Sequence, residues 1–342
     1  MLLLDHIAQC TQPFIVASKN AGARRLAGAS DYARTLMRCP LRYVLADDLV
    51  RTCTALGFSE GDEISGCLDL LHLPAEQLWV EWNENARRSA LEQVLPECKS
   101  SQPDETSRSG TLIHAHRNGR SGRIQTFWLP RGSREPLLAA METLLDLDGH
   151  LEGAPADGLF EGQSVKVFDE VNPQLDHVLR CVRFRFHTSW GHYYAGQTSD
   201  PTVRAHLVHS ALSAVAFDVP VLLALFLLQS VRADLVEQAV DPGRLNVKRV
   251  RTGKPPLLSH VEVSAPVFMQ VGRPSGQPRG ARRPGPRFHH VRGHIVRRRS
   301  TVYWRGPHWR GHIRLGSIRS RTVKLRLPRP EPENATSHIE VT

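Results

Sequence analysis

Negative charge is absent from a long part of this chain. Between Val263 and Pro330 there are 17 Lys or Arg residues and not one Asp or Glu. The last 102 residues, 241–342, hold 22 basic and 5 acidic side chains, whereas residues 1–240 hold 22 basic and 29 acidic ones. The net charge of +10 therefore divides into +17 and −7. A stretch of like charges repels itself unless an anionic partner lies against it, and nucleic acid is the commonest such partner.

Signals for metal clusters, secretion and membranes are also few. The six cysteines include no CxxC pair, which excludes a zinc ribbon and favours free thiols in a reducing cytoplasm. No secretory signal is indicated, because Asp5 and His6 interrupt the apolar start. The longest apolar run, Val219–Leu228, is too short to span a bilayer. We therefore expect a cytoplasmic protein without a membrane partner.

Lysine is scarce, since only 6 of the 44 basic residues are Lys and the rest are Arg. Selection for forked guanidinium contacts to phosphates and guanines would produce this bias. A GC-rich genome would produce it too. The bias leaves both explanations open.

The spacing of apolar residues predicts an α+β protein, with a helical and mixed-sheet body and a small C-terminal antiparallel β module. Leu78–Trp82 is short, aromatic and β-branched, which predicts a strand. Thr111–His116 and Ile124–Leu129 flank a turn with Asn118-Gly119, which predicts a hairpin.

Three stretches predict helices. Apolar residues between Pro136 and Gly149 fall on one helical face and predict a helix over 137–145. Residues 203–215 repeat at the same spacing. The helix that starts near Pro220 is apolar all round, which predicts a position in the middle of the core.

Composition divides the chain into six segments, with linkers where Ser, Pro, Gly and Arg accumulate. The predicted segments are an N-terminal α+β region (1–98), a linker (99–110), a hairpin and helical core region (111–262), a basic Pro/Gly/Arg linker (263–287), a basic β module (288–330) and a mobile tail (331–342).

The basic β module is the candidate nucleic-acid interface. Its alternation places Val291 and Ile295 on an apolar face that packs on the body, and cations on the other face. Thr301–Trp304 and Arg321–Leu327 are further predicted strands, and a second basic cluster at 248–254 extends the same track. Cations in such a surface contact phosphates while aromatic rings stack on unpaired bases. The alternative is a solvated charged face whose aromatics are core. The candidate contacts are Arg249, Lys254, Arg287, His290, Arg292, His294, Arg297, Arg298, Arg299, Trp304, Arg305, His308, Trp309, Arg310 and Lys324.

The histidines of this module could serve as metal ligands or as catalysts. On a strand, His290 and His294 would lie about 13 Å apart, too far for one ion, so we expect no metal and no cofactor. Neutral His beside Arg could serve a metal-independent nuclease, with His294 and His308 as weak catalytic candidates. Hydrogen bonds from these imidazoles to backbone or phosphate are the stronger interpretation. We expect a binding protein rather than an enzyme.

Two further signals lie in the body. His114 and His116 have the strand spacing of two metal ligands, although isolated pairs of this kind usually face solvent. Glu81 could be catalytic, although a carboxylate on an edge strand is the simpler interpretation.

Three segments carry a resemblance to other proteins. They are Leu78–Trp82; Leu245-Asn246 with Arg249 and then Gly253-Lys254-Pro255-Pro256-Leu257; and Pro286-Arg287-Phe288-His289 with Arg292-Gly293-His294 and Trp304–Gly311. On these segments the chain resembles an uncharacterised set of proteins encoded by phages, prophages and related mobile elements of bacteria. It departs from that set at residues 306–316, which are richer in His and Arg.

The resemblance implies a phage accessory or replication-associated protein that acts in a bacterial cytoplasm, and it implies no particular reaction. The leading hypothesis is that the chain binds DNA or RNA through phosphate contacts of its basic module. One alternative is a structural or assembly protein, in which the basic module docks on the acidic body of another copy in a homo-oligomer. The His/Arg nuclease is the other.

Overall fold

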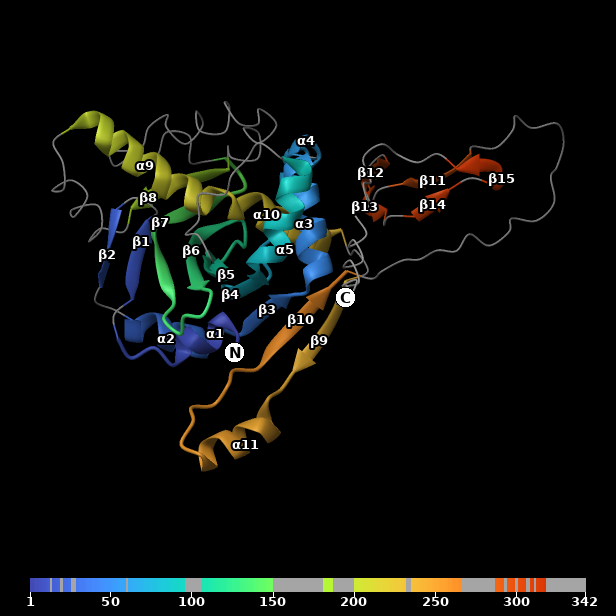
Figure 1. Cartoon of the computed structure of the whole chain (residues 1–342). Coiled ribbons are helices and arrows are strands. Elements are labelled where there is room, and N and C mark those ends of the chain that lie inside the picture. The colour runs from blue at the N-terminus through green and yellow to red at the C-terminus, as the bar shows by residue number, and fades with distance from the viewer. Residues whose placement is uncertain are drawn as a thin grey trace, which may run out of the picture. The chain divides into compact units, whose positions relative to one another are not determined.

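The chain folds as two compact units (Figure 1). The first, here called the body, comprises Met1–Pro266 and Ile295–Trp304, and the second, the basic unit, comprises Val267–His294 and Arg305–Thr342. The structure is a computed structural model. It describes residues 1–12, 14–18, 21–25, 29–59, 61–95, 106–149, 181–186, 200–231, 235–265, 287–291, 294–298, 301–305, 308–310 and 312–317.

A mixed β-sheet forms the centre of the body. In the described residues ten strands join it in the order β2-β1-β7-β6-β5-β4-β3-β10-β9, and β8 pairs with β7 off this path. Pairing is parallel between β1 and β7, β3 and β4, and β3 and β10, and antiparallel elsewhere. The strands are β1 Ile15–Ser18, β2 Ala21–Arg25, β3 Leu41–Leu45, β4 Gln77–Asn83, β5 Thr106–Ala115, β6 Ser121–Pro130, β7 Leu137–Asp146, β8 Val182–Phe186, β9 Val236–Val240 and β10 His260–Ser264.

Helices cover both faces of this sheet. On one face lie α1 and α2, where the ring of Phe14 contacts Tyr32 of α2 and Phe127 of β6 edge to face. On the other face lie α3, α5, α9 and α10. The helices are α1 Leu3–Ala8, α2 Ala29–Arg38, α3 Asp47–Ser59, α4 Gly61–Ser65, the 3-10 helix η1 Leu68–Leu70, α5 Glu84–Val94, α9 Pro201–Ala216, α10 Asp218–Ser230 and α11 Gly243–Arg251.

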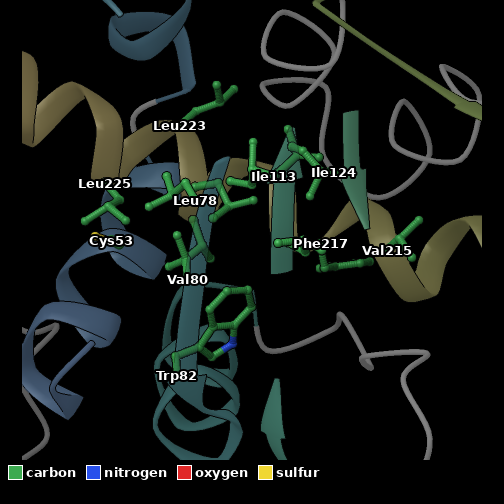
Figure 2. Close-up of a cluster of buried hydrophobic side chains, with 14 of the residues drawn as sticks. Cys53, Leu78, Val80, Trp82, Ile113, Ile124, Val215, Phe217, Leu223 and Leu225 are labelled. Carbon is green, nitrogen blue, oxygen red and sulfur yellow. The ribbon is translucent and has the colours of Figure 1, made fainter. Parts of the chain in front are cut away.

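Alternation along β4 sends neighbouring residues to opposite cores. Leu78 and Val80 point toward Cys53 of α3 and Leu225 of α10 (Figure 2). Trp79 points to the α1 face, where its ring centroid lies 5.9 Å from that of Phe127. The predicted strand is therefore confirmed. It is a central strand between β3 and β5, so the interpretation of Glu81 as an edge-strand residue is wrong.

The hairpin and two of the three helices are confirmed. β5 and β6 pair in antiparallel fashion around a turn in which Gly119 has a φ of 66°, a value that favours glycine. The apolar helix is α10, whose residues from Asp218 to Leu228 are all buried. A stretch of 21 residues, Ser210–Ser230, is long and apolar enough to cross a membrane, and its most apolar 18-residue window is buried inside the body.

The helix predicted over 137–145 is wrong, because Leu137–Asp146 form strand β7. β7 pairs with β6, β1 and β8, and nearly all of its residues are buried. A strand with two covered faces shows a continuous apolar run. Apolar spacing alone does not distinguish such a run from a buried helix.

The predicted linker at 99–110 is wrong in its second half, because Thr106–Ala115 form β5. The regions 1–98 and 111–262 also share one sheet, since β10 pairs with β3 and β5 pairs with β4. The fold class is α+β, as predicted.

Gly110 of β5 tests how closely the α1 face is packed. A Cβ built on Gly110 would lie 2.4 Å from Cζ2 of Trp79 and 3.2 Å from Cδ2 of Leu3. Because Trp79 is fully buried, we expect Gly110→Ala to lower the free energy of unfolding by about 1–3 kcal/mol, measured by urea titration. Gly243→Ala is the control, since its Cβ would meet only the carboxylate of Asp241, at 3.3 Å. Equal stability of both variants would contradict this packing.

Candidate nucleic-acid interface

One part of the predicted interface is an arm between β9 and β10. The arm, residues 241–259, contains α11 and extends beyond the ends of both strands (Figure 1). α11 has no buried residue. It ends where Gly253 takes a φ of 68° and donates its N–H to the carbonyl of Val250 at 3.0 Å. Gly253 and the prolines after it stop the helix.

Two side chains of α11 close the arm on itself. The Asn246 amide donates to the carbonyl of Leu257 at 2.9 Å and accepts from the N–H of Leu257 at 2.7 Å. Nε of Arg249 donates to the carbonyl of Pro255 at 2.8 Å. The segment 245–257, on which part of the resemblance rests, is therefore a set of residues that hold one another. Their joint role is to fix the shape of the arm.

The arm is also anchored to α1. Oδ1 of Asp5 accepts the N–H of Leu258 at 2.9 Å, and Nε2 of Gln9 donates to the carbonyl of Pro256 at 3.5 Å. Asp5 is buried. A buried carboxylate with a backbone donor is a strong anchor, so the arm has a fixed root.

The arm carries five cations that the body does not neutralise. Within the described ranges, none of these side chains pairs with a carboxylate. Four of the five are exposed and one, Arg249, is half-exposed. The cations are Arg244, Lys248, Arg249, Arg251 and Lys254.

Arginines nearer the sheet are different, because carboxylates hold several of them. The distances are 2.5 Å from Nη2 of Arg87 to Oε1 of Glu84, 3.4 Å from Nε of Arg88 to the same oxygen, and 2.6 Å from Nη2 of Arg120 to Oδ1 of Asp148. Arg108 pairs with Glu81, and Arg185 pairs with Glu142. Acids of the body thus neutralise these five arginines.

The basic unit brings predicted contacts together by strand pairing. It contains β11 Arg287–Val291, β14 His308–Arg310 and β15 His312–Ser317 in the order β14-β11-β15. β14 is antiparallel to β11 and places His289 opposite Arg310 and His290 opposite Trp309. β15 is parallel to β11, which departs from a wholly antiparallel module, and Arg287 pairs with His312.

The structure describes some of the remaining predicted residues and leaves others out. Trp304 lies in β13 Thr301–Arg305, which pairs with β12 His294–Arg298, the strand of Arg297 and Arg298. Ile295, Val302 and Trp304 pack against the core of the body, which confirms the predicted packing for Ile295. For Trp304 this contact favours the core alternative over base stacking. Val291, the other residue of that predicted face, lies on a different strand, β11. Arg305 is exposed. Arg292, Arg299, Lys324 and the predicted strand Arg321–Leu327 lie outside the described residues.

The strand pairing does not bring the two catalytic candidates opposite each other. His294 begins β12, which pairs with β13, whereas His308 begins β14 and pairs with Val291 of β11.

Two histidines of the body were the other metal candidates. Burial and then Arg123 lower the pKa of His114, and Nδ1 of His116 lies 3.0 Å from Oγ of Ser121. No group of three or more potential metal ligands occurs in the part of the chain that the structure describes.

Glu81 anchors α1 to the sheet. Its carboxylate accepts the backbone N–H groups of Leu3 at 2.7 Å and Leu4 at 2.9 Å, Nε1 of Trp79 at 3.2 Å, and Nε of Arg108. It is fully buried. Four donors and complete burial leave it no access to a substrate, so a catalytic role is not supported.

A second buried cluster lies on the opposite face of the sheet. Glu84 accepts Nε1 of Trp82 at 3.2 Å and Oγ of Ser109 at 2.9 Å, besides its pair with Arg87. Asp218 accepts Oγ1 of Thr126 at 3.2 Å. Burial raises the pKa of Asp218 to about 7, against the opposing effect of Arg87, and Glu84 adds to the rise.

Sequence reasoning missed the residues that shape the arm's root. In the sequence, Asp5 indicates only a break in an apolar start, and no pattern points to Arg134. Arg134 belongs to the turn between β6 and β7, with Gly132, Ser133 and Pro136 as turn signals. Those signals predict a turn but do not predict that it faces the arm.

Comparisons with protein-family models, with curated proteins and with solved structures found no match. The interpretation of the interface therefore rests on the geometry and charge of the chain itself.

The raised pKa of Asp218 predicts how stability changes with pH. A folded state that holds this proton more tightly than the unfolded state loses stability as pH rises from about 4 to about 7. Asp218→Asn removes that loss. We expect the stability of the variant relative to the parent to rise by on the order of 2 kcal/mol between about pH 5 and pH 8, measured by urea titration. Asp69→Asn, at an exposed carboxylate, is the control. A constant difference across pH for Asp218→Asn would disprove the shift.

Proposed function

We propose that this protein binds nucleic acid, mainly through phosphate groups, and that the arm and the strands of the basic unit form the contacting surfaces. The observation that carries the proposal is that five cations gather on one short arm and pair with no carboxylate in the described ranges. Carboxylates hold five arginines nearer the sheet, which are Arg87, Arg88, Arg108, Arg120 and Arg185. Phosphates supply the missing negative charge. Release of their counterions favours the complex at low salt.

The sequence after the arm supports the same surface. β10 leads directly into the stretch from Val263 to Pro330 that has 17 cations and no acid. Strand pairing in the basic unit sets His290 opposite Trp309 and His289 opposite Arg310, so the strands that carry these residues lie side by side. We place this activity in a phage- or prophage-type accessory protein, on the three segments that resemble such proteins. Both DNA and RNA fit this chemistry.

The arm's contribution is tested by removing three exposed cations that hold no carboxylate. We expect the full-length protein to bind single-stranded nucleic acid with a slope of log K against log salt of roughly −3 to −5, as for four to six phosphate contacts. In Arg244→Ala/Lys248→Ala/Arg251→Ala the slope should flatten by about 2, because each lost contact removes about 0.7 to 0.9. Fluorescence anisotropy over a salt series measures both slopes, with DNA and RNA probes in parallel.

A matched control separates contact from net charge. Arg38→Ala/Arg51→Ala/Arg117→Ala removes the same charge from exposed positions of the body outside the arm. This control should keep the parent slope. Identical slopes for the arm variant and the parent would rule out the arm as a contact surface.

Self-association is a second candidate, favoured by apolar side chains on the arm. Leu245, Val247 and Val250 of α11 are 50%, 55% and 62% exposed. Such residues on a basic helix suit a protein surface as well as a polyanion. The acidic body of another copy would then be the partner.

A salt series in size-exclusion chromatography separates the two functions. If nucleic-acid binding is the function, the protein should elute at one position at all salt concentrations, and nucleic acid should shift it at low salt. Self-association that weakens with salt, without a nucleic-acid shift, would favour the second candidate.

A further inference from the structure

A cavity of about 750 Å³ lies at the root of the arm. Three segments distant in sequence form its wall: the residues of α1 and just after it, the turn between β6 and β7, and the arm. Its volume is within the range of roughly 300–1,000 Å³ that is usual for small-ligand sites. All of its wall belongs to the body.

The charged side chains on this wall are mainly positive. Arg134, Arg249 and Lys254 contribute three cations against the single carboxylate of Glu135. In the described ranges no carboxylate pairs with Arg134 or Lys254. The cavity therefore has an unbalanced positive charge, which favours an anionic ligand.

Hydrogen bonds fix the side chain of Arg249 and the backbone at Lys254 and Arg134. Arg249 is fixed by its Nε bond to Pro255, and the N–H of Lys254 donates to the carbonyl of Arg249 at 2.9 Å. On the facing wall, Nδ1 of His6 lies 3.0 Å from the carbonyl oxygen of Arg134. A preformed site loses little conformational entropy when a ligand binds.

Neutral donors complete the wall. Thr11, Gln12 and Ser133 lie around the cavity. A phosphate group offers several charged acceptor oxygens. Such oxygens make strong bonds with guanidinium and ammonium groups, and hydroxyl and amide donors satisfy the remaining lone pairs.

We infer that this cavity binds a phosphate group, with Arg134, Arg249 and Lys254 as its charged contacts. The group can come from a free phosphate-bearing molecule or from the terminal phosphate of a nucleic-acid strand. Arg249 and Lys254 belong both to this cavity and to the proposed nucleic-acid surface of the arm. Arg134 lies outside the arm, so a change of Arg134 tests the cavity separately from the proposed function.

Isothermal titration calorimetry on the full chain tests the site with inorganic phosphate. The parent protein should bind it, and Arg134→Ala and Lys254→Ala should each weaken binding at least about tenfold, the usual loss of one charge-assisted hydrogen bond. Arg117→Ala, at an exposed position outside the cavity, should bind as the parent does. Absence of phosphate binding by the parent, or unchanged binding by Arg134→Ala, would overturn the assignment.

Two oligothymidylates, one with a 5′-phosphate and one with a 5′-hydroxyl, identify the source of the group. Tighter binding of the phosphorylated strand that is lost in Arg134→Ala supports a strand terminus. Equal binding of both strands, with inorganic phosphate still bound, supports a free ligand.

Two variants distinguish an absence of phosphate binding in the cavity from an absence of nucleic-acid binding by the arm. Arg244→Ala/Lys248→Ala/Arg251→Ala leaves the cavity's wall intact and should retain inorganic phosphate binding. Arg134→Ala should retain the parent's affinity for the 5′-hydroxyl strand.

Discussion

Burial of carboxylates in the middle of the body is the constraint on which the rest of the structure depends. Glu81 and Glu84 are fully buried, at the end of the central strand β4 and the start of α5. A buried carboxylate without partners would be strongly destabilising. The fold therefore directs Arg108 to Glu81 and Arg87 to Glu84, and it adds the start of α1 to one cluster and indole N–H groups to both.

Two classes of cations stand out in the described residues. The first consists of five arginines near the sheet that pair with acids of the body, namely Arg87, Arg88, Arg108, Arg120 and Arg185. The second class lies in the arm, where a backbone carbonyl holds the side chain of Arg249 and Asp5 anchors the root, while the five cations pair with no carboxylate in the described ranges. The proposed interface and the positive cavity beside it have the same origin. In both, the cations of the arm pair with no carboxylate within the described residues.

Much of the fold follows from local patterns, and the exceptions have physical causes. The hairpin at Gly119 and the apolar helix α10 were predicted because turn chemistry and all-round apolarity are local signals. β7 was missed because a strand covered on both faces has no alternation. The candidate interface could be predicted from the distribution of charge along the chain, because a run of cations without acids is a local signal. The pairing of Asn246 with Leu257 and the approach of Arg134 to the arm could not, since both depend on contacts between distant segments.

Hydrogen–deuterium exchange with and without single-stranded nucleic acid tests the separation of the two classes most directly. The account predicts slower exchange at backbone amides of residues 243–258 and 287–317 when nucleic acid is added at low salt. Exchange should stay unchanged in α5, whose Arg87 and Arg88 pair with Glu84, and in β4, which carries the buried Glu81. Protection confined to the body's sheet, with none in the arm, would contradict the account.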